Sequence, residues 1–484
     1  MAIKRGAIFD YLLYFAGHVV PRVLSAAALA VYTRRLIPEE YGHYSLALAW
    51  VVVILIVFLY WIQSSLQRLL PEHEVRGTNA TLIGTARSTG VLIVALLCPV
   101  VWLAGRSILP GLALPAVFSW IAQGLFSLVQ ATTIARRESR LFLTYSSIDS
   151  FLKIGIGIAV VTRGLGIGWL LGLPAVSGVL VFVIESIRLH VRGLSRFALD
   201  VGVLRSMLRL GAPLAATWIG AIALSSLDRF MFQWLSTPAQ LGVYAAAYPL
   251  GDAMVQVFAT PVLFTFGPRI FAIAAKSGLV DARDHLRQVI LYVAVGLGAI
   301  IAIAIGSADA VRVVFLGRDY VGAEQVIPYV SAGLALWVLG SLAAKEFELT
   351  KQTGRTVAPI LAAAVVNGVC NLFMIPRYGG TGAAVATLIG YGTYFALAAV
   401  RAGTPSLSIV RTHWSVPIAA VAAGWLVRVS PWPASDQRFA RLVFAPTTSL
   451  CAYLALVLLA RQPQGVALLR LLVRRITTAR REPV

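Results

Sequence analysis

Charged residues are scarce in this chain of 484 residues: 13% are Asp, Glu, Lys or Arg, whereas 59% are hydrophobic. A soluble domain carries about 25% charged residues. The charges stand in short clusters between apolar runs of about 18 to 25 residues. A run of this length crosses a hydrocarbon core of about 30 Å as a helix. Because backbone polar groups in lipid must be satisfied within the segment, the sequence predicts an all-α polytopic membrane protein.

Cysteine is also rare, and its three copies, Cys98, Cys370 and Cys451, each lie in an apolar run. They have no paired spacing, which excludes a disulfide framework and a cysteine metal site. No arrangement in the sequence has the spacing of a nucleophile triad, a paired-carboxylate site or a metal site. We therefore expect no catalytic residue, no metal and no cofactor.

Long loops are missing, and none could house a soluble catalytic domain. A membrane glycosyltransferase or polymerase, the alternative from an enzyme class, usually places its chemistry in such a loop. The short loops therefore disfavour an enzyme and favour a transporter.

Acidic residues number 20 against 41 Lys and Arg, which gives a formal net charge of +21. The basic residues flank hydrophobic runs, so membrane topology and anionic lipid headgroups account for them. No module that combines aromatic and basic residues interrupts the runs, and we expect no nucleic-acid partner.

About fourteen membrane spans can be placed, although twelve is the alternative because the last two runs are the weakest. The N-terminal run has the basic start of a signal peptide, but Asp10, His18 and Arg22 interrupt it, so it reads as a retained first span. The predicted spans are 8–33, 44–63, 87–105, 110–133, 141–161, 164–187, 208–234, 240–265, 287–306, 326–345, 355–375, 380–400, 413–430 and 442–460.

The basic residues also predict orientation. With the N-terminus in the cytoplasm, about 28 Lys and Arg fall on the cytoplasmic side and about 10 on the other. Cytoplasmic loops of membrane proteins carry such an excess. The sequence thus predicts a multi-pass protein of a cell inner membrane with both termini in the cytoplasm.

An internal repeat relates the two halves of the chain. Pro38, Gly42 and Tyr44 recur as Pro238, Gly242 and Tyr244, each shifted by 200 positions, and 164–166 recurs as 380–382. These repeated positions align the first six predicted spans with the next six. We therefore expect two six-helix bundles at 1–200 and 201–403, related by a pseudo-two-fold axis along the membrane normal. Two additional helices follow at 404–462, and a basic cytoplasmic tail occupies 463–484.

Four stretches resemble one family in the correct order. They are Leu36-Ile37-Pro38-Glu39-Glu40-Tyr41-Gly42-His43-Tyr44; Gly211-Ala212-Pro213 with Asp228-Arg229 and Gly242-Val243-Tyr244; Phe315-Leu316-Gly317-Arg318-Asp319-Tyr320; and Asn371 with Ile375-Pro376-Arg377-Tyr378-Gly379-Gly380-Thr381-Gly382. Together they resemble the polysaccharide flippases, the O-antigen flippase type, of the multidrug/oligosaccharidyl-lipid/polysaccharide exporter superfamily.

The resemblance implies two bundles around a central cavity and alternating-access transfer of a polyprenyl-diphosphate-linked oligosaccharide from the cytoplasmic to the periplasmic leaflet. The cargo would be a repeat unit of O-antigen, capsule or exopolysaccharide. A polysaccharide polymerase and glycosyltransferases would be its partners, alongside membrane lipids. A multidrug or organic-cation antiporter of the same superfamily is the alternative.

The charged residues Arg22, Lys153, Arg229, Asp149, Asp228 and Asp252 fall inside predicted spans, where each central charge costs about 2.5 to 3.5 kcal/mol. Their side chains should therefore pair or face a wet cavity. Arg22, Lys153 and Arg229 are the candidates for binding a diphosphate, because cations form charge-assisted hydrogen bonds to phosphate. Asp149, Asp228 and Asp252 are candidates for support or ion coupling. Asp149 and Lys153, four residues apart, can pair on one helix face.

Overall fold

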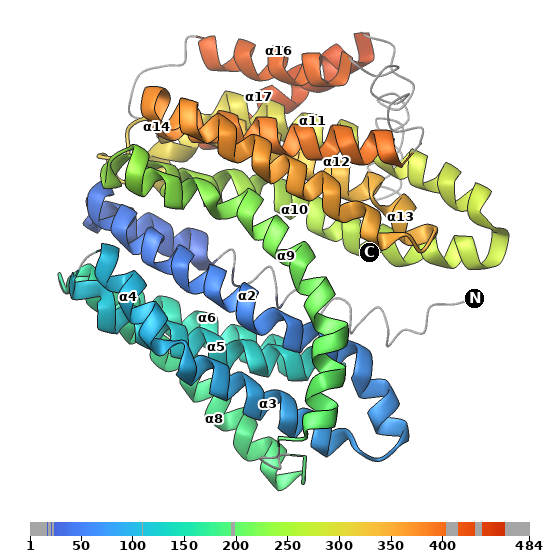
Figure 1. Cartoon of the computed structure of the whole chain (residues 1–484). Helices are drawn as coiled ribbons and strands as arrows, with labels where there is room; N and C mark the ends of the chain where they lie inside the picture. Colours follow the sequence, from blue (N-terminus) through green and yellow to red (C-terminus); the bar gives the residue numbers. More distant parts are fainter. Residues whose placement is uncertain are drawn as a thin grey trace, which may run out of the picture. The chain divides into compact units, whose positions relative to one another are not determined.

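The computed structural model describes residues 17, 21, 24–108, 110–194, 199–402, 415–430 and 438–459. Within these ranges every regular element is a helix (Figure 1), which confirms the predicted all-α class. The first unit holds α2 (Pro38–Val75), α3 (Asn79–Leu96), α4 (Cys98–Ile108), η1 (Pro110–Leu112), α5 (Ala113–Ala135), α6 (Ser139–Thr162), α7 (Ile167–Gly172), η2 (Leu173–Ala175), α8 (Val176–Val191) and α9 (Val201–Leu235). The later helices are α10 (Pro238–Ser277), α11 (Leu279–Phe315), α12 (Ala323–Ala343), α13 (Lys345–Leu349), η3 (Thr353–Thr356), α14 (Val357–Arg401), α16 (Ser415–Val429) and α17 (Arg438–Leu459).

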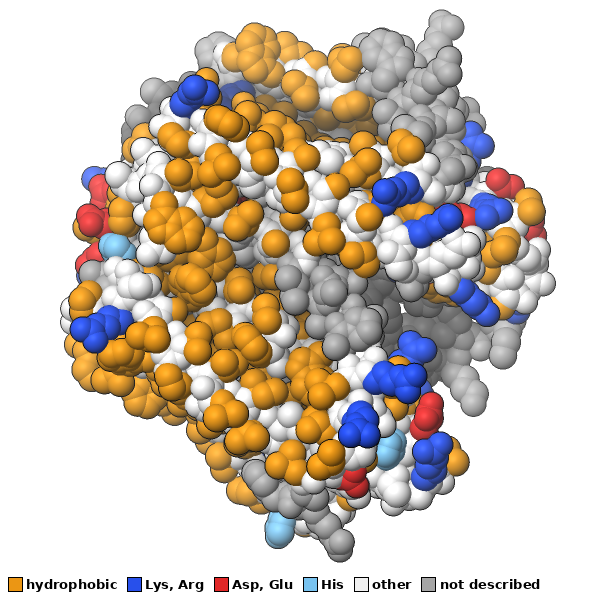
Figure 2. Space-filling model, in the orientation of Figure 1, with side chains coloured by type: hydrophobic (Ala, Val, Ile, Leu, Met, Phe, Trp, Pro, Cys, Tyr) orange, Lys and Arg blue, Asp and Glu red, His pale blue; other side chains and the backbone are white. Residues whose placement is uncertain are grey.

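The helices have the length and composition of membrane spans. Eight described helical stretches are long and apolar enough to cross a bilayer, and two shorter apolar helices lie at Ser415–Val429 and Val443–Val457. Figure 2 shows hydrophobic side chains over most of the displayed surface, with charged side chains gathered toward its margins. The chain is therefore a multi-pass membrane protein.

The predicted span 87–105 was placed wrongly. The structure has two helices there, and α3 begins at Asn79, well before position 87. The break between α3 and α4 falls at Leu97, next to Pro99 in the first turn of α4. Proline accounts for the break, because it lacks the N–H that an unbroken helix needs. Arg87 consequently lies in the middle of α3, where it is only 5% exposed.

The predicted pair of spans at 355–375 and 380–400 corresponds to α14. This stretch is two helices joined at a kink, where Gly379 has φ 53° and ψ −129°. A side chain is disfavoured at this positive φ, so glycine permits the break.

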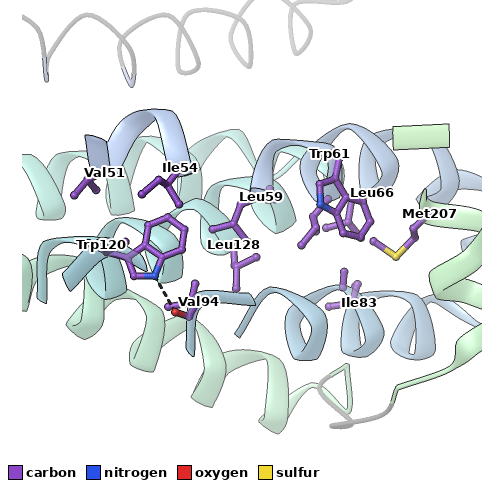
Figure 3. Packing of buried hydrophobic residues seen from close by; sticks show 14 of the residues in the cluster. Val51, Ile54, Leu59, Trp61, Leu66, Ile83, Val94, Trp120, Leu128 and Met207 are labelled. Carbon is purple, nitrogen blue, oxygen red and sulfur yellow. Dashed lines mark hydrogen bonds between the residues drawn. The ribbon is translucent and has the colours of Figure 1, made fainter. Parts of the chain in front are cut away.

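The described residues form two compact units, Met1–Ala246 and Ala247–Val484. In the first, α2 packs against α3, α5 and α9. Figure 3 shows their shared core, in which Leu59 of α2 lies near Leu128 of α5, and Trp120 of α5 donates its indole N–H to the Val94 carbonyl oxygen at 2.8 Å. That bond satisfies the one polar atom of a large side chain that is fully buried.

In the second unit, α11 is the central helix, and α12, α16 and α17 pack against it, while α12 also packs against α14. The Tyr453 hydroxyl of α17 donates to the Val295 carbonyl oxygen of α11 at 2.8 Å. The finer division at 200, 403 and 462 and the pseudo-two-fold axis stay predictions, and the predicted tail at 463–484 lies outside the described residues.

The repeated motif meets its own copy inside the first unit. Both α2 and α10 begin at a proline, the first helical position that proline favours. A methyl group added to Gly42 would collide with the Pro238 carbonyl oxygen, and one added to Gly242 would collide with the Pro38 carbonyl oxygen. The two helix starts thus cross reciprocally, backbone against backbone.

Candidate functional site

A cavity of about 290 Å³ lies within the first unit, between α5, α6 and the helical residues that precede α2. Its polar lining comes mainly from α6, where Ser146, Asp149, Ser150 and Lys153 follow a spacing of three and four residues. Residues at this spacing share one helix face. The whole lining is Gly17, Pro21, Ser25, Phe126, Gln130, Phe142, Ser146, Asp149, Ser150, Lys153 and Ile154.

The charged centre of the cavity is the ion pair of Lys153 and Asp149. Lys153 Nζ donates to Asp149 Oδ2 at 3.0 Å, as the four-residue spacing predicted. The Ser177 hydroxyl, at the start of α8, donates to the other carboxylate oxygen, Oδ1, at 2.6 Å. Asp149 is therefore held from two helices.

The two charges of this pair differ in accessibility. The Lys153 side chain is 38% exposed, whereas the Asp149 side chain is 6% exposed. Lys153 Nζ also lies 5.9 Å from the centre of the Phe126 ring, at the outer range of a cation–π contact. An ammonium group has three N–H donors, and Asp149 accepts one of them. Lys153 can thus offer donors to an anion that enters the cavity.

Two uncharged polar side chains add to the lining. Ser146 is 3% exposed, and among the described residues its hydroxyl has no hydrogen-bond partner. A buried hydroxyl without a partner costs free energy, so a ligand or water in the cavity would stabilise it. Gln130 of α5 lines the cavity as well, and its amide group can both donate and accept hydrogen bonds. The arrangement suits a polar ligand with several acceptor atoms.

Two of the other predicted site residues are not joined to this cavity by the described structure. Arg22 lies outside the described residues. Asp252 is partly buried on α10 in the second unit. The roles assigned to these two residues stay predictions.

Asp228 and Arg229 lie on α9, and neither lines the cavity. Asp228 is 2% exposed and accepts a hydrogen bond from the Tyr244 hydroxyl of α10. Its other oxygen, Oδ1, accepts from the backbone N–H of Arg229 at 2.7 Å. Asp228 therefore links α9 to α10, and a role in transport stays a prediction for both residues.

Sequence reasoning missed a second charged cluster, which centres on Glu185. Glu185 is fully buried on α8, and its carboxylate accepts from Arg188 Nε and Nη2, both at 2.7 Å. The Tyr145 hydroxyl of α6 donates to it at 2.9 Å. Arg87 of α3 interacts with Glu185 through charge and donates to the Ser186 hydroxyl. The sequence feature that could have indicated this cluster is Glu185 itself, an acidic residue inside the predicted span 164–187.

The same cluster extends to the turn before α6 through Glu138. Its carboxylate pairs with Arg136 at 3.2 Å, Arg188 at 2.6 Å and Arg192 at 3.6 Å. Burial alone would raise the pKa of Glu138, but the hydrogen bonds and charges of Arg188 and Arg136 outweigh burial and hold the pKa below its ordinary value.

We expect Glu138 to stabilise the fold at neutral pH and to lose this effect in acid. Since its pKa is lower in the folded state, its contribution is complete above the unfolded pKa of about 4.3 and is lost as pH falls through the folded value. Thermal unfolding in neutral detergent should show Glu138→Gln less stable than the unsubstituted protein at pH 7, and the gap should narrow below about pH 4. A gap that stays constant as the pH is lowered through this range would contradict the assigned charge pairing.

Residues 10–273 match the family described as polysaccharide biosynthesis protein. No curated protein sequence matches the chain.

Solved structures share its fold. A lipid II flippase, MurJ, in an inward closed conformation aligns with a TM-score of 0.73 and 14% identity, over 93% of this chain and 99% of that chain. An inward-facing MATE family multidrug resistance transporter of the MOP superfamily aligns with a TM-score of 0.56 and 12% identity, over 83% and 99% of the two chains. A mutant of the Vibrio cholerae MATE transporter VcmN aligns with a TM-score of 0.51 and 14% identity, over 85% and 97%.

Proposed function

Because the chain belongs to the polysaccharide biosynthesis protein family, we propose that it is a flippase that moves a polyprenyl-diphosphate-linked oligosaccharide across a bacterial inner membrane by alternating access. The direction is from the cytoplasmic to the periplasmic leaflet. The fold shared with a lipid II flippase supports this proposal. The described residues form helices with short connections between them, which supports transport rather than catalysis.

The physical problem of this transport is the diphosphate. An ionised group that enters hydrocarbon without partners costs tens of kcal/mol by solvation alone. A flippase must therefore supply donors inside the bilayer while the polyprenyl tail stays in lipid. Cavity walls built from α5 and α6, both candidate membrane spans, are suited to this task.

The single observation that carries the proposal is the placement of Lys153 in this cavity. Its ammonium group is partly exposed, and its counter-ion Asp149 is held on the far oxygen by Ser177. A phosphate oxygen that approaches Lys153 can replace the hydrogen bond to Asp149, and the carboxylate keeps the bond from Ser177. Lys153 thus exchanges the Asp149 carboxylate for the phosphate and always keeps an anionic partner. When the phosphate is released, Lys153 pairs with Asp149 again.

A second candidate function is export of organic cations. Asp149 supplies a carboxylate, and Phe126 and Phe142 supply aromatic rings to the same cavity. Aromatic faces and a carboxylate attract cations. The MATE fold at a TM-score of 0.56 is compatible with this alternative.

Reconstituted vesicles distinguish the two functions. We expect vesicles that contain the purified protein to move a fluorescent polyprenyl-diphosphate oligosaccharide between leaflets faster than protein-free vesicles, as measured by the fraction open to an impermeant quencher. An organic-cation dye should not be accumulated in the same vesicles. Dye accumulation with no movement of the lipid would reject the flippase in favour of the antiporter.

A further inference from the structure

Two basic residues have strained backbone at matching places in the two halves of the chain. Arg137 has φ 57° and Lys351 has φ 58°, and they are the described non-glycine residues with positive φ. They are 214 positions apart, close to the shifts of 200 and 216 that relate the sequence repeats. Each lies in a turn that leads to a long helix, Arg137 before α6 and Lys351 before η3 and α14.

Both turns have the same hydrogen bonds. The N–H of Glu138 bonds the Thr133 carbonyl oxygen at 2.9 Å, and the N–H of Gln352 bonds the Phe347 carbonyl oxygen at 2.7 Å. This six-to-one bond defines the Schellman motif, whose left-handed position is usually glycine. Three further helix ends in the described chain have the same bond, and there the left-handed residue is Gly77, Gly164 or Gly193.

A side chain in this conformation costs roughly 1 kcal/mol relative to glycine. Strained backbone that persists in a fold points to a function for the residue that is strained. Arg137 and Lys351 share one property, an exposed positive charge. We therefore connect the strained backbone at Arg137 and Lys351 with a function of their positively charged side chains.

The nearby acids are already engaged by other cations. Glu138 pairs with Arg136, Arg188 and Arg192. Within the described residues, Arg137 takes part in no ion pair, and its charge is not compensated by its acidic neighbour.

The second turn repeats this arrangement. Glu346 pairs with Arg283 at 2.6 Å, and Glu348 pairs with Lys345 at 2.7 Å. Lys351 has no ion-pair partner in the described part of the chain, and the neighbouring Arg355 is exposed. Each turn thus presents one cation from a fixed backbone position with its local acids neutralised.

We propose that Arg137 and Lys351 each bind the headgroup phosphate of an anionic glycerophospholipid in the leaflet that faces the cytoplasm. Both turns fall on the cytoplasmic side in the orientation predicted from the sequence. That leaflet has a negative surface potential, which attracts basic groups placed next to a span. The proposal does not depend on which cargo the protein carries.

Glycine substitutions test the proposal because they should raise thermal stability and lower affinity for an anionic lipid. In neutral detergent, Arg137→Gly and Lys351→Gly should each raise the melting temperature by about 1–2 °C, because the strain is relieved. Affinity for phosphatidylglycerol in mixed micelles should fall about fivefold in each variant and about 25-fold in the double variant. A phosphatidylcholine titration should be unchanged.

Charge-matched variants separate strain from charge. Arg137→Lys should retain phosphatidylglycerol binding, whereas Arg137→Gln, which keeps a long side chain, should lose it to the same extent as glycine. Inorganic phosphate, as a competitor that lacks the lipid, should not displace phosphatidylglycerol at millimolar concentration. Equal phosphatidylglycerol affinity in the unsubstituted protein and in the Arg137→Gln/Lys351→Gln double variant would overturn the proposal.

Discussion

The double substitution Lys153→Met with Asp149→Asn is expected to weaken binding of a polyprenyl-diphosphate oligosaccharide by about 10- to 100-fold. Charge-assisted hydrogen bonds contribute about 1.5–3 kcal/mol, which corresponds to this range. Lys153 is replaced together with Asp149 because the Asp149 side chain is only 6% exposed. Removing the lysine alone would leave a buried carboxylate without its counter-ion and would confuse loss of binding with loss of folding.

The single substitution Asp149→Asn gives the opposite expectation. Lys153 then has no internal anion, so the diphosphate should bind several-fold more tightly, and transport should slow because the exchange of anions is lost. The measurement is equilibrium binding of the labelled lipid to purified protein in neutral detergent, together with the vesicle assay.

A matched ion pair outside the cavity provides the control. Lys345 and Glu348 pair at 2.7 Å on α13, and the variant Lys345→Met/Glu348→Gln should bind the lipid as the unsubstituted protein does. If Lys153→Met/Asp149→Asn bound the lipid as tightly as the unsubstituted protein, Lys153 would not be part of the binding site. Tighter binding of an organic cation in Lys153→Met would identify the antiporter instead.

The second large effect is expected at Glu185. Glu185→Ala should lower the free energy of unfolding by about 3–5 kcal/mol, because breaking a buried ion pair leaves a charge without compensation. The charge that loses its acidic neighbour is Arg87, which is 5% exposed, whereas Arg188 loses two hydrogen bonds at 2.7 Å but keeps its ion pair with Glu138. Chemical unfolding in neutral detergent, followed by the loss of helical signal, measures the change.

Two further variants separate the contributions to this effect. Tyr145→Phe removes one neutral donor to Glu185 and should cost only about 1 kcal/mol. Glu74→Ala, at an exposed carboxylate near the end of α2, should change stability by less than about 0.5 kcal/mol. If Glu185→Ala were no more destabilising than Glu74→Ala, the buried network would have no structural role.

Hydrophobic run length predicted most of this fold because it reports a single physical constraint, the thickness of the hydrocarbon core. Where the structure differs from the spans predicted from run length, individual residues within the apolar stretches account for the difference. The break beside Pro99 ends α3 at Leu96, and because α3 begins at Asn79, Arg87 lies in its interior. A run-length analysis alone does not detect this, because Arg87 marked the apparent start of the apolar stretch at 87–105.

The site was predictable only where it is local in sequence. The pairing of Asp149 with Lys153 follows from their spacing on one helix. The contact of Ser177 with Asp149 does not, since 28 positions separate them and the packing of α8 on α6 brings them together. The long-range bond from Arg188 to Glu138 needed the same tertiary information.

The reciprocal crossing of Gly42 and Gly242 restricts how the sequences of the two repeats can diverge over evolutionary time. At either glycine the obstacle to a larger residue is a main-chain oxygen of the opposite proline, and no side-chain substitution removes a main-chain oxygen. A compensating change elsewhere therefore cannot rescue a mutation at one of these positions. We therefore expect the sequence similarity between the two repeats to persist at Gly42 and Gly242 after it has disappeared at most other positions.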